Sequence, residues 1–201
     1  MASGTPSATA KAQADSNSKA PSFESIGVKN TQVNQGQGVN LSSHQKLLVG
    51  SVLDLFAGRP TLSHLSLWLP TATFADPITS ATGYDRFAAQ WYGLPAVFDP
   101  IQLVSHQVVS AGNPIELDLC NKYTLKGIKK EQEIASRVRI FVDEASGKIE
   151  KVEDKWDGKL PDGVFSEAFR KLNAVTVPTM VKVPKTEEED RKMIAEREGQ
   201  K

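Results

Sequence analysis

Two side chains in this sequence have the chemistry and the setting for proton transfer. Asp76 follows directly on the apolar run Thr71–Ala75, and His106 lies in a second apolar run, residues 100–110, in phase with Val108. A carboxylate or an imidazole beside an apolar pocket is suited to removing a proton from a carbon next to a carbonyl. The plainer roles are a carboxylate that accepts backbone N–H groups at a turn, which lowers its pKa, and a hydrogen-bonded histidine at a sheet surface.

Aromatic residues recur at helical spacing shortly after this carboxylate. Tyr84, Phe87 and Trp91 stand at positions i, i+3 and i+7 of a helix predicted at residues 83–92, which Pro95 is expected to end. Such a face stacks a planar ligand or forms ordinary core. Two aromatic residues further along the chain, Tyr123 and Trp156, are also candidates for an inward position.

No pattern of metal or nucleotide ligands accompanies these residues. The histidines share no i, i+3 or i, i+4 spacing, and no Cys/His cluster, Gly-rich phosphate loop or GxSxG sequence occurs. Cys120 is the single cysteine and has no sequence feature that marks it as a nucleophile. We therefore expect neither a metal site nor a cofactor.

Composition limits the classes of partner. The 201 residues contain 24 Lys and Arg and 24 Asp and Glu, so the formal net charge is zero and gives no general attraction to nucleic acid or to a membrane surface. No apolar run approaches the roughly 20 residues of a membrane span, and the N-terminus has no apolar signal region. With a single cysteine, these features favour a cytoplasmic protein that binds neither nucleic acid nor membrane.

The hydrophobic periodicity predicts helices first and a long hairpin sheet afterwards. Ser42 and Gln45 form a capping box before an apolar helix, and a short second helix carries Leu62 and Leu65. Asp76-Pro77 is expected to end a first strand. Runs that read as strands joined by hairpins then occupy residues 100–110, 115–126, 133–143 and 148–157.

The chain divides into four parts by composition. Residues 1–40 are poor in large apolar residues and are predicted to be disordered, and residues 42–160 form the folded domain. Residues 161–184 form an extension with a short amphipathic helix that packs on the domain. Residues 185–201 are a charged tail, expected to be a solvated helix that frays.

The order of these elements resembles the NTF2-like superfamily, and in particular its SnoaL-like branch, over roughly residues 42–160. The resemblance rests on "LWLPTATFADPI", the helix after it, and the last strand "SGKIEKVEDKWDG". It implies an α+β cone, in which a strongly curved, mainly antiparallel sheet wraps around three N-terminal helices, followed by a short C-terminal helix. It also implies a pocket in the open end of the cone, lined here by Tyr84, Phe87, Trp91, Tyr123 and Trp156.

The resemblance extends distantly to the ketosteroid isomerases and suggests roles for individual residues. In those enzymes the Asp of a similar Asp-Pro is the base that moves the proton, which here is Asp76. Their two oxyanion donors are a helix Tyr and a strand Asp, and this chain has Ser51 and Val138 or Arg139 in the corresponding regions. Lyases of the superfamily use strand His and Asp residues as acid and base, and His106 would correspond, with Asp118 as its partner.

Three functions follow from this reading. The first is a SnoaL-like protein of unassigned activity that binds a small apolar or aromatic molecule in the cone. The second is a cofactor-free isomerase or lyase with Asp76 as the base, assisted by His106 or Tyr84. The third is a dimeric interaction module with a filled pocket, because sheets of this family often pair face to face.

Overall fold

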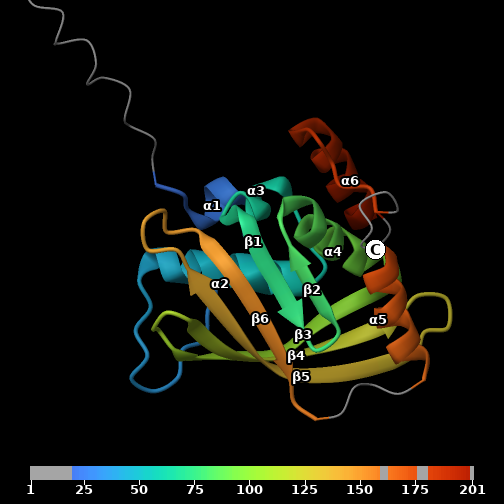
Figure 1. Cartoon of the computed structure of the whole chain (residues 1–201), viewed down its shortest axis with the longest axis horizontal. Coiled ribbons are helices and arrows are strands. Elements are labelled where there is room, and N and C mark those ends of the chain that lie inside the picture. Colours follow the sequence, from blue (N-terminus) through green and yellow to red (C-terminus); the bar gives the residue numbers. More distant parts are fainter. Residues whose placement is uncertain (1–19, 159–162, 176–180, 200–201) are drawn as a thin grey trace, which may run out of the picture.

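The computed structural model describes residues 20–158, 163–175 and 181–199. None of the helices in these ranges is long and apolar enough to cross a membrane. The elements follow one another along the chain (Figure 1) as α1 (Phe23–Ile26), α2 (Ser43–Phe56), α3 (Leu62–Leu65), β1 (Trp68–Asp76), β2 (Thr79–Thr82), α4 (Tyr84–Val97), β3 (Phe98–Ser110), β4 (Ile115–Leu125), β5 (Glu131–Val142), β6 (Ile149–Trp156), α5 (Val164–Val175) and α6 (Glu187–Gly199).

The strands form one six-stranded sheet in the order β2-β1-β6-β5-β4-β3. All neighbours are antiparallel except β1 and β6, which run parallel. The sheet curves around α2 and α4 (Figure 1), and the side chains between them form a continuous core. The predicted α+β class with a strongly curved, mainly antiparallel sheet is confirmed.

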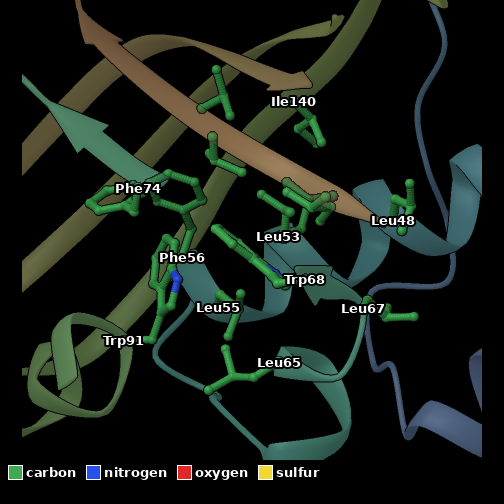
Figure 2. Packing of buried hydrophobic residues seen from close by; sticks show 14 of the residues in the cluster. Leu48, Leu53, Leu55, Phe56, Leu65, Leu67, Trp68, Phe74, Trp91 and Ile140 are labelled. Atoms are coloured by element: carbon green, nitrogen blue, oxygen red, sulfur yellow. The ribbon is translucent and has the colours of Figure 1, made fainter. Parts of the chain in front are cut away.

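The core is built around α2. Every residue from Leu47 to Phe56 is buried, so this helix is enclosed on all sides. It begins at the predicted capping box, in which the Gln45 amide donates to Ser42 Oγ (3.1 Å) and the Ser42 amide donates to Gln45 Oε1 (3.0 Å). Figure 2 shows side chains of α2 packed with residues from three other elements, which are Trp68 and Phe74 of β1, Ile140 of β5 and Trp91 of α4.

Residues 20–40 correct the prediction of disorder, since they form α1 and then cross the domain. The Gly36 amide donates to the carbonyl of Val108 (2.8 Å), and the Val108 amide donates to the carbonyl of Asn34 (2.8 Å). Asn30 passes so close to α2 that a Cβ on Gly50 would lie 2.5 Å from its carbonyl oxygen. The few apolar residues of this segment are therefore sufficient to order it, because backbone hydrogen bonds to β3 add to the effect of their burial. The prediction for residues 1–19 lies outside the described residues.

Helix α4 is longer than predicted and runs through Gly93 and Pro95 to Val97. Pro95 lies in its last turn, and the helix ends two residues later, at Val97. Gly93 allows close packing, because a Cβ there would lie 2.8 Å from Cδ1 of Leu172 on α5, and that side chain would have to shift. Gly93 therefore marks a close approach of two helices rather than the end of α4.

The charged tail is docked, which corrects the prediction of a solvated helix. Asp190 of α6 is buried and accepts hydrogen bonds from the Tyr92 hydroxyl (2.8 Å) and from the Leu62 amide (2.8 Å). Arg197 of the same helix donates to the carbonyl of Pro60 (2.8 Å). The sequence of α6 gave little sign of this, because polar contacts and the single side chain of Met193, rather than a continuous apolar face, attach it to the domain.

The burial of Trp91 predicts a large loss of stability in Trp91→Ala. This side chain is 1% exposed, and its removal leaves a cavity among other rings, so we expect a loss of about 3–5 kcal/mol in the free energy of unfolding. Urea unfolding measures it, with Arg86→Ala on the exposed face of α4 as the control, expected within about 0.5 kcal/mol of the parent. Equal midpoints for the two variants would contradict this packing.

The contacts of Asp190 predict that Asp190→Ala releases α6. The Tyr92 hydroxyl and the Leu62 amide lose their acceptor, which costs about 1–3 kcal/mol and raises the population of the undocked helix roughly tenfold or more. Limited trypsin digestion followed by mass spectrometry should show faster cleavage at Arg191. The matched control is Glu196→Ala on the exposed side of α6, and equal cleavage of both variants would show that Asp190 does not hold the tail.

Candidate functional site

The interior of the cone contains a small cavity. Its volume is about 30 Å³, whereas one water needs about 10–15 Å³ on the same measure. It therefore has room for two or three waters. The walls come from seven elements and are formed by Phe56, Phe74, Asp76, Gln90, Trp91, Leu94, Tyr123, Ile134, Asp154, Trp156, Phe169 and Leu172.

Asp76 lies at a hairpin that the sequence analysis did not anticipate. Pro77 and Ile78 form the turn, after which β2 returns antiparallel along β1 with Asp76 opposite Thr79. Oδ1 of Asp76 accepts the Ile78 amide (2.9 Å), so the carboxylate does cap a turn, as one of the two predicted roles requires. Burial nevertheless raises the pKa of Asp76, because it outweighs the hydrogen bonds from Ile78 and Thr79. The expectation of a lowered pKa was wrong.

A second carboxyl group, Asp154 on β6, lies beside the first. Phe74 pairs with Val152 and Ala75 pairs with Glu153 across the parallel strands, so Asp76 and Asp154 are next in register. Their Cα atoms are expected to be about 5 Å apart. Both residues share the inward phase of Phe74 and Val152, which are buried in the core.

Asp154 is almost completely buried and poorly compensated. It is 7% exposed, and Oδ2 accepts a hydrogen bond from Trp156 Nε1 (2.7 Å), while Oδ1 has no partner among the described residues. Burial raises its pKa to about 7, against the opposing effect of Ser136 and Trp156, and the nearby charge of Asp76 adds to the rise. Sequence reasoning missed this residue. The available signal was its place between Val152 and Trp156 in the inward phase of a strand.

Three of the five predicted pocket aromatics line the cavity, namely Trp91, Tyr123 and Trp156. Trp91 packs between Phe56 and Phe74 with ring centroids 5.1 and 4.6 Å away, as Figure 2 shows. The other two predicted aromatics lie elsewhere. Phe87 is buried against Trp68 at 5.1 Å, and Tyr84 is 36% exposed at the start of α4.

His106 lies outside the cone and does not meet Asp76. It is half-buried on β3, where its Nε2 accepts the Asn34 amide (3.1 Å) and so fastens the N-terminal segment. Asp118 is bound instead by Arg137 Nε (2.6 Å) on the surface of the sheet. Strand β3 carries register shifts on both sides of His106, and a bulge changes which face a residue occupies. Simple alternation therefore could not place this histidine.

The described residues contain no cluster of three or more metal-ligating side chains. The two other histidines also have structural partners. His44 donates to the carbonyl of Gly147 (2.7 Å), and His64 contacts the buried Asp54 (3.2 Å). None of these contacts places a histidine in the wall of the cone cavity.

A larger hollow of about 110 Å³ lies outside the cone, where the α2–α3 connection, the start of β3 and α6 meet. Its charged lining includes side chains that already hold the fold. Arg59 and His64 contact Asp54, and Arg197 donates to the carbonyl of Pro60. Among the described residues, one buried polar atom of this hollow's lining residues, Arg197 Nη1, has no partner, whereas the cone cavity has three such atoms, which are Gln90 Oε1, Trp91 Nε1 and Asp154 Oδ1. The cone is therefore the better candidate site.

No protein-family model matches the sequence, and no curated protein sequence is significantly similar to it. Solved structures do share its architecture. A steroid Δ-isomerase from Pseudomonas aeruginosa is 14% identical and superimposes with a TM-score of 0.51, covering 71% of this chain and 97% of its own. The chain has the NTF2-like cone fold. A second match, an NTF2-like protein of unknown function from Burkholderia pseudomallei, is 13% identical with a TM-score of 0.47 and covers 63% and 96% of the two chains.

In this NTF2-like cone, the site departs from the pattern that the resemblance implied. The first carboxylate, Asp76, is the last residue of β1, as the resemblance implied. The expected positions of the two donors are occupied by Ser51, whose Oγ donates to the carbonyl of Leu48, and by Val138 of the core. A second carboxyl group is still present, but it comes from the last strand. The cone therefore contains two carboxyl groups, but the second comes from β6 and not from the strand that the resemblance indicated.

The burial of Asp154 predicts that Asp154→Asn stabilises the protein only at high pH. A carboxyl group whose folded pKa is raised favours folding below its unfolded pKa, and that contribution is lost as the pH rises through about 7. We expect the variant to gain up to roughly 4 kcal/mol relative to the parent at pH 8, and little at pH 4. Urea unfolding at both pH values measures this. Asp118→Asn, at an exposed carboxylate, is the control, and a gain that is equal at both pH values would contradict the burial of Asp154.

Proposed function

We propose that the protein is a cofactor-free proton-transfer enzyme of the isomerase or lyase type, acting on a small apolar or aromatic carbonyl compound bound in the cone. The observation that carries this proposal is the pair of neighbouring carboxyl groups, Asp76 and Asp154, in a cavity with aromatic walls. Two such groups held in different environments lose their protons at different pH values, which allows one to act as base while the other acts as acid.

In the proposed reaction Asp76 is the base. Its carboxylate is fixed at the hairpin by the Ile78 amide (2.9 Å), and burial raises its pKa, which strengthens it as a proton acceptor. It takes a proton from the carbon next to the substrate carbonyl. The electron pair of the broken C–H bond moves into the carbonyl and forms an enolate. Asp76 then returns the proton to another carbon, as in an isomerase, or a leaving group departs from the enolate, as in a lyase.

Asp154 acts as the neutral acid that stabilises the enolate oxygen. With a pKa of about 7 it keeps its proton under mildly acidic conditions, and a protonated carboxyl group donates a strong hydrogen bond. The unpartnered Trp91 Nε1 is a second donor in the same wall. The aromatic walls exclude water, which strengthens both interactions.

Two other functions remain as alternatives. A protein that binds without catalysis needs the cavity alone. An interaction module with a filled cone is favoured by α5, because Phe169 and Leu172 occupy much of the interior. The outer face of the sheet supports this second alternative less well, since it carries ion pairs rather than an apolar patch. Arg137 pairs with Asp118 (2.6 Å), and Arg139 pairs with Glu116 (3.1 Å). Homodimerisation through this face would have to use polar contacts.

Exchange of a carbon-bound proton tests the enzymatic proposal without knowledge of the natural substrate. We expect the protein to accelerate deuterium uptake from D₂O at the acidic methylene of 2-tetralone, an aromatic ketone, as measured by NMR. Asp76→Asn removes the base and should lower the rate at least about 100-fold. The rate should fall as the pH rises through about 7, when Asp154 ionises.

The matched control is Asp118→Asn, which makes the same chemical change on the outer face of the sheet and should leave the exchange rate unchanged. An exchange rate that Asp76→Asn does not alter would contradict the proposal. A rate that keeps rising through pH 8 would remove Asp154 from its role as the acid.

A further inference from the structure

Helix α5 contributes to the wall of the cone cavity. Phe169 and Leu172 form part of the cavity wall, and Phe165 and Ala168 are buried beside them. The opposite side of the helix is exposed, and in Figure 1 α5 lies beside the sheet as a separate element that follows β6. None of its described side chains makes a hydrogen bond or an ion pair with the cone. The described side chains of α5 therefore contact the cone through apolar packing.

The ring of Phe169 occupies an aromatic box. Its centroid lies 4.8 Å from that of Phe98, 5.2 Å from that of Trp156 and 5.9 Å from that of Tyr123. These distances are typical of favourable ring contacts, and the box borders the cavity that contains Asp76. A phenyl ring of the chain itself thus lines the same cavity as the two carboxyl groups.

The fit between α5 and the cone is incomplete on the polar side. Among the other residues that line this cavity, three have a buried polar atom without a partner among the described residues, and these atoms are Gln90 Oε1, Trp91 Nε1 and Asp154 Oδ1. Phenyl and leucyl groups supply neither a donor nor an acceptor. Unpaired buried polar atoms are costly, so an occupant with both a ring and a polar group would complement this interior better than α5 does.

We propose that α5 is a built-in occupant of the cone. Phe169 holds the place of a substrate ring, and α5 leaves the mouth of the cone when an aromatic molecule that carries a hydroxyl or carbonyl group binds. The chemistry assigned to the ligand rests on the proposed function, but the displacement of α5 does not depend on turnover. The cavity of about 30 Å³ is too small for such a ligand while α5 is in place, so binding requires this movement.

The ligand and α5 then compete for one site. A competitor within the same chain lowers the apparent affinity for ligand by the fraction of time that the site is open. The exposed face of α5 carries Glu167 and Arg170, which keep one side of the helix solvated wherever it lies. In the absence of ligand, the closed helix keeps bulk water away from Asp76 and Asp154.

Hydrogen exchange on the full-length protein tests the displacement directly. The probe is 2-naphthol, a planar aromatic molecule with one hydroxyl group. On binding, we expect exchange to become faster in the amides of α5 and slower in those of β1 and β6. Probe binding with unchanged or slower exchange in α5 would overturn the proposal.

Affinity measurements provide a second readout. Phe169→Ala removes the competing ring, so its affinity for 2-naphthol should rise about tenfold over that of the parent. Arg170→Ala, on the exposed face of the same helix, is the matched control and should bind as the parent does. Naphthalene, which lacks the hydroxyl group, should bind more weakly than 2-naphthol to both proteins. Equal affinity for the two probes would show that Phe169→Ala merely opens an apolar hole, and would overturn the proposal.

These results separate the displacement of α5 from the enzymatic proposal. If 2-naphthol displaces α5 while Asp76→Asn leaves proton exchange in 2-tetralone unaltered, the inference stands and the proposed function fails. If exchange depends on Asp76 while α5 stays protected in the presence of the probe, the inference fails and the proposed function stands. No binding of 2-naphthol to the parent or to Phe169→Ala up to about 1 mM would also overturn the inference.

Discussion

The parallel pairing of β1 with β6 is the contact on which the rest of the structure depends. It joins the first hairpin to the end of the long meander, so that one sheet curves around α2 and α4. The same register, Phe74 with Val152 and Ala75 with Glu153, brings the two inward carboxyl groups together. A shift by one residue would turn β6 over and move Asp154 to the outer face, because side chains alternate along a strand. The register between β1 and β6 therefore determines both the closure of the sheet and the arrangement of the candidate site.

Two buried carboxyl groups in this chain show how environment separates a structural role from a chemical one. Asp54 is fully buried, yet its pKa is lowered, because the hydrogen bonds from His64 and Lys29 and the charge of Arg59 together outweigh burial. Asp154 is about as buried but has few donors, and its pKa is raised to about 7. A carboxylate with enough hydrogen-bond donors holds segments together, as Asp54 does. A buried carboxyl group with too few donors, such as Asp154, gains free energy when a ligand supplies the missing hydrogen bond.

Segments at both ends of the chain complete the domain, and they do so by different means. The N-terminal residues pair with β3 and cross α2, α5 packs apolar side chains into the cone, and α6 is held by Asp190 and Arg197. Of these, only α5 touches the candidate site. Its position couples access to the cone with the conformation of an extension that lies outside the part of the chain resembling the NTF2-like superfamily.

Features that depend on residues close together in the chain could be predicted from the sequence alone. Helical and strand periodicity gave the order of most elements, though not α1 or β2, and also the capping box at Ser42, the inward phase of Tyr123 and a carboxylate at the end of the first strand. Only the tertiary structure placed Asp154 beside Asp76, moved His106 out of the site and seated α5 over the cavity. Periodicity is local and can be read along the chain. The meeting of distant residues depends instead on strand register, on bulges and on which segments bury one another, and these are decided when the whole sheet closes.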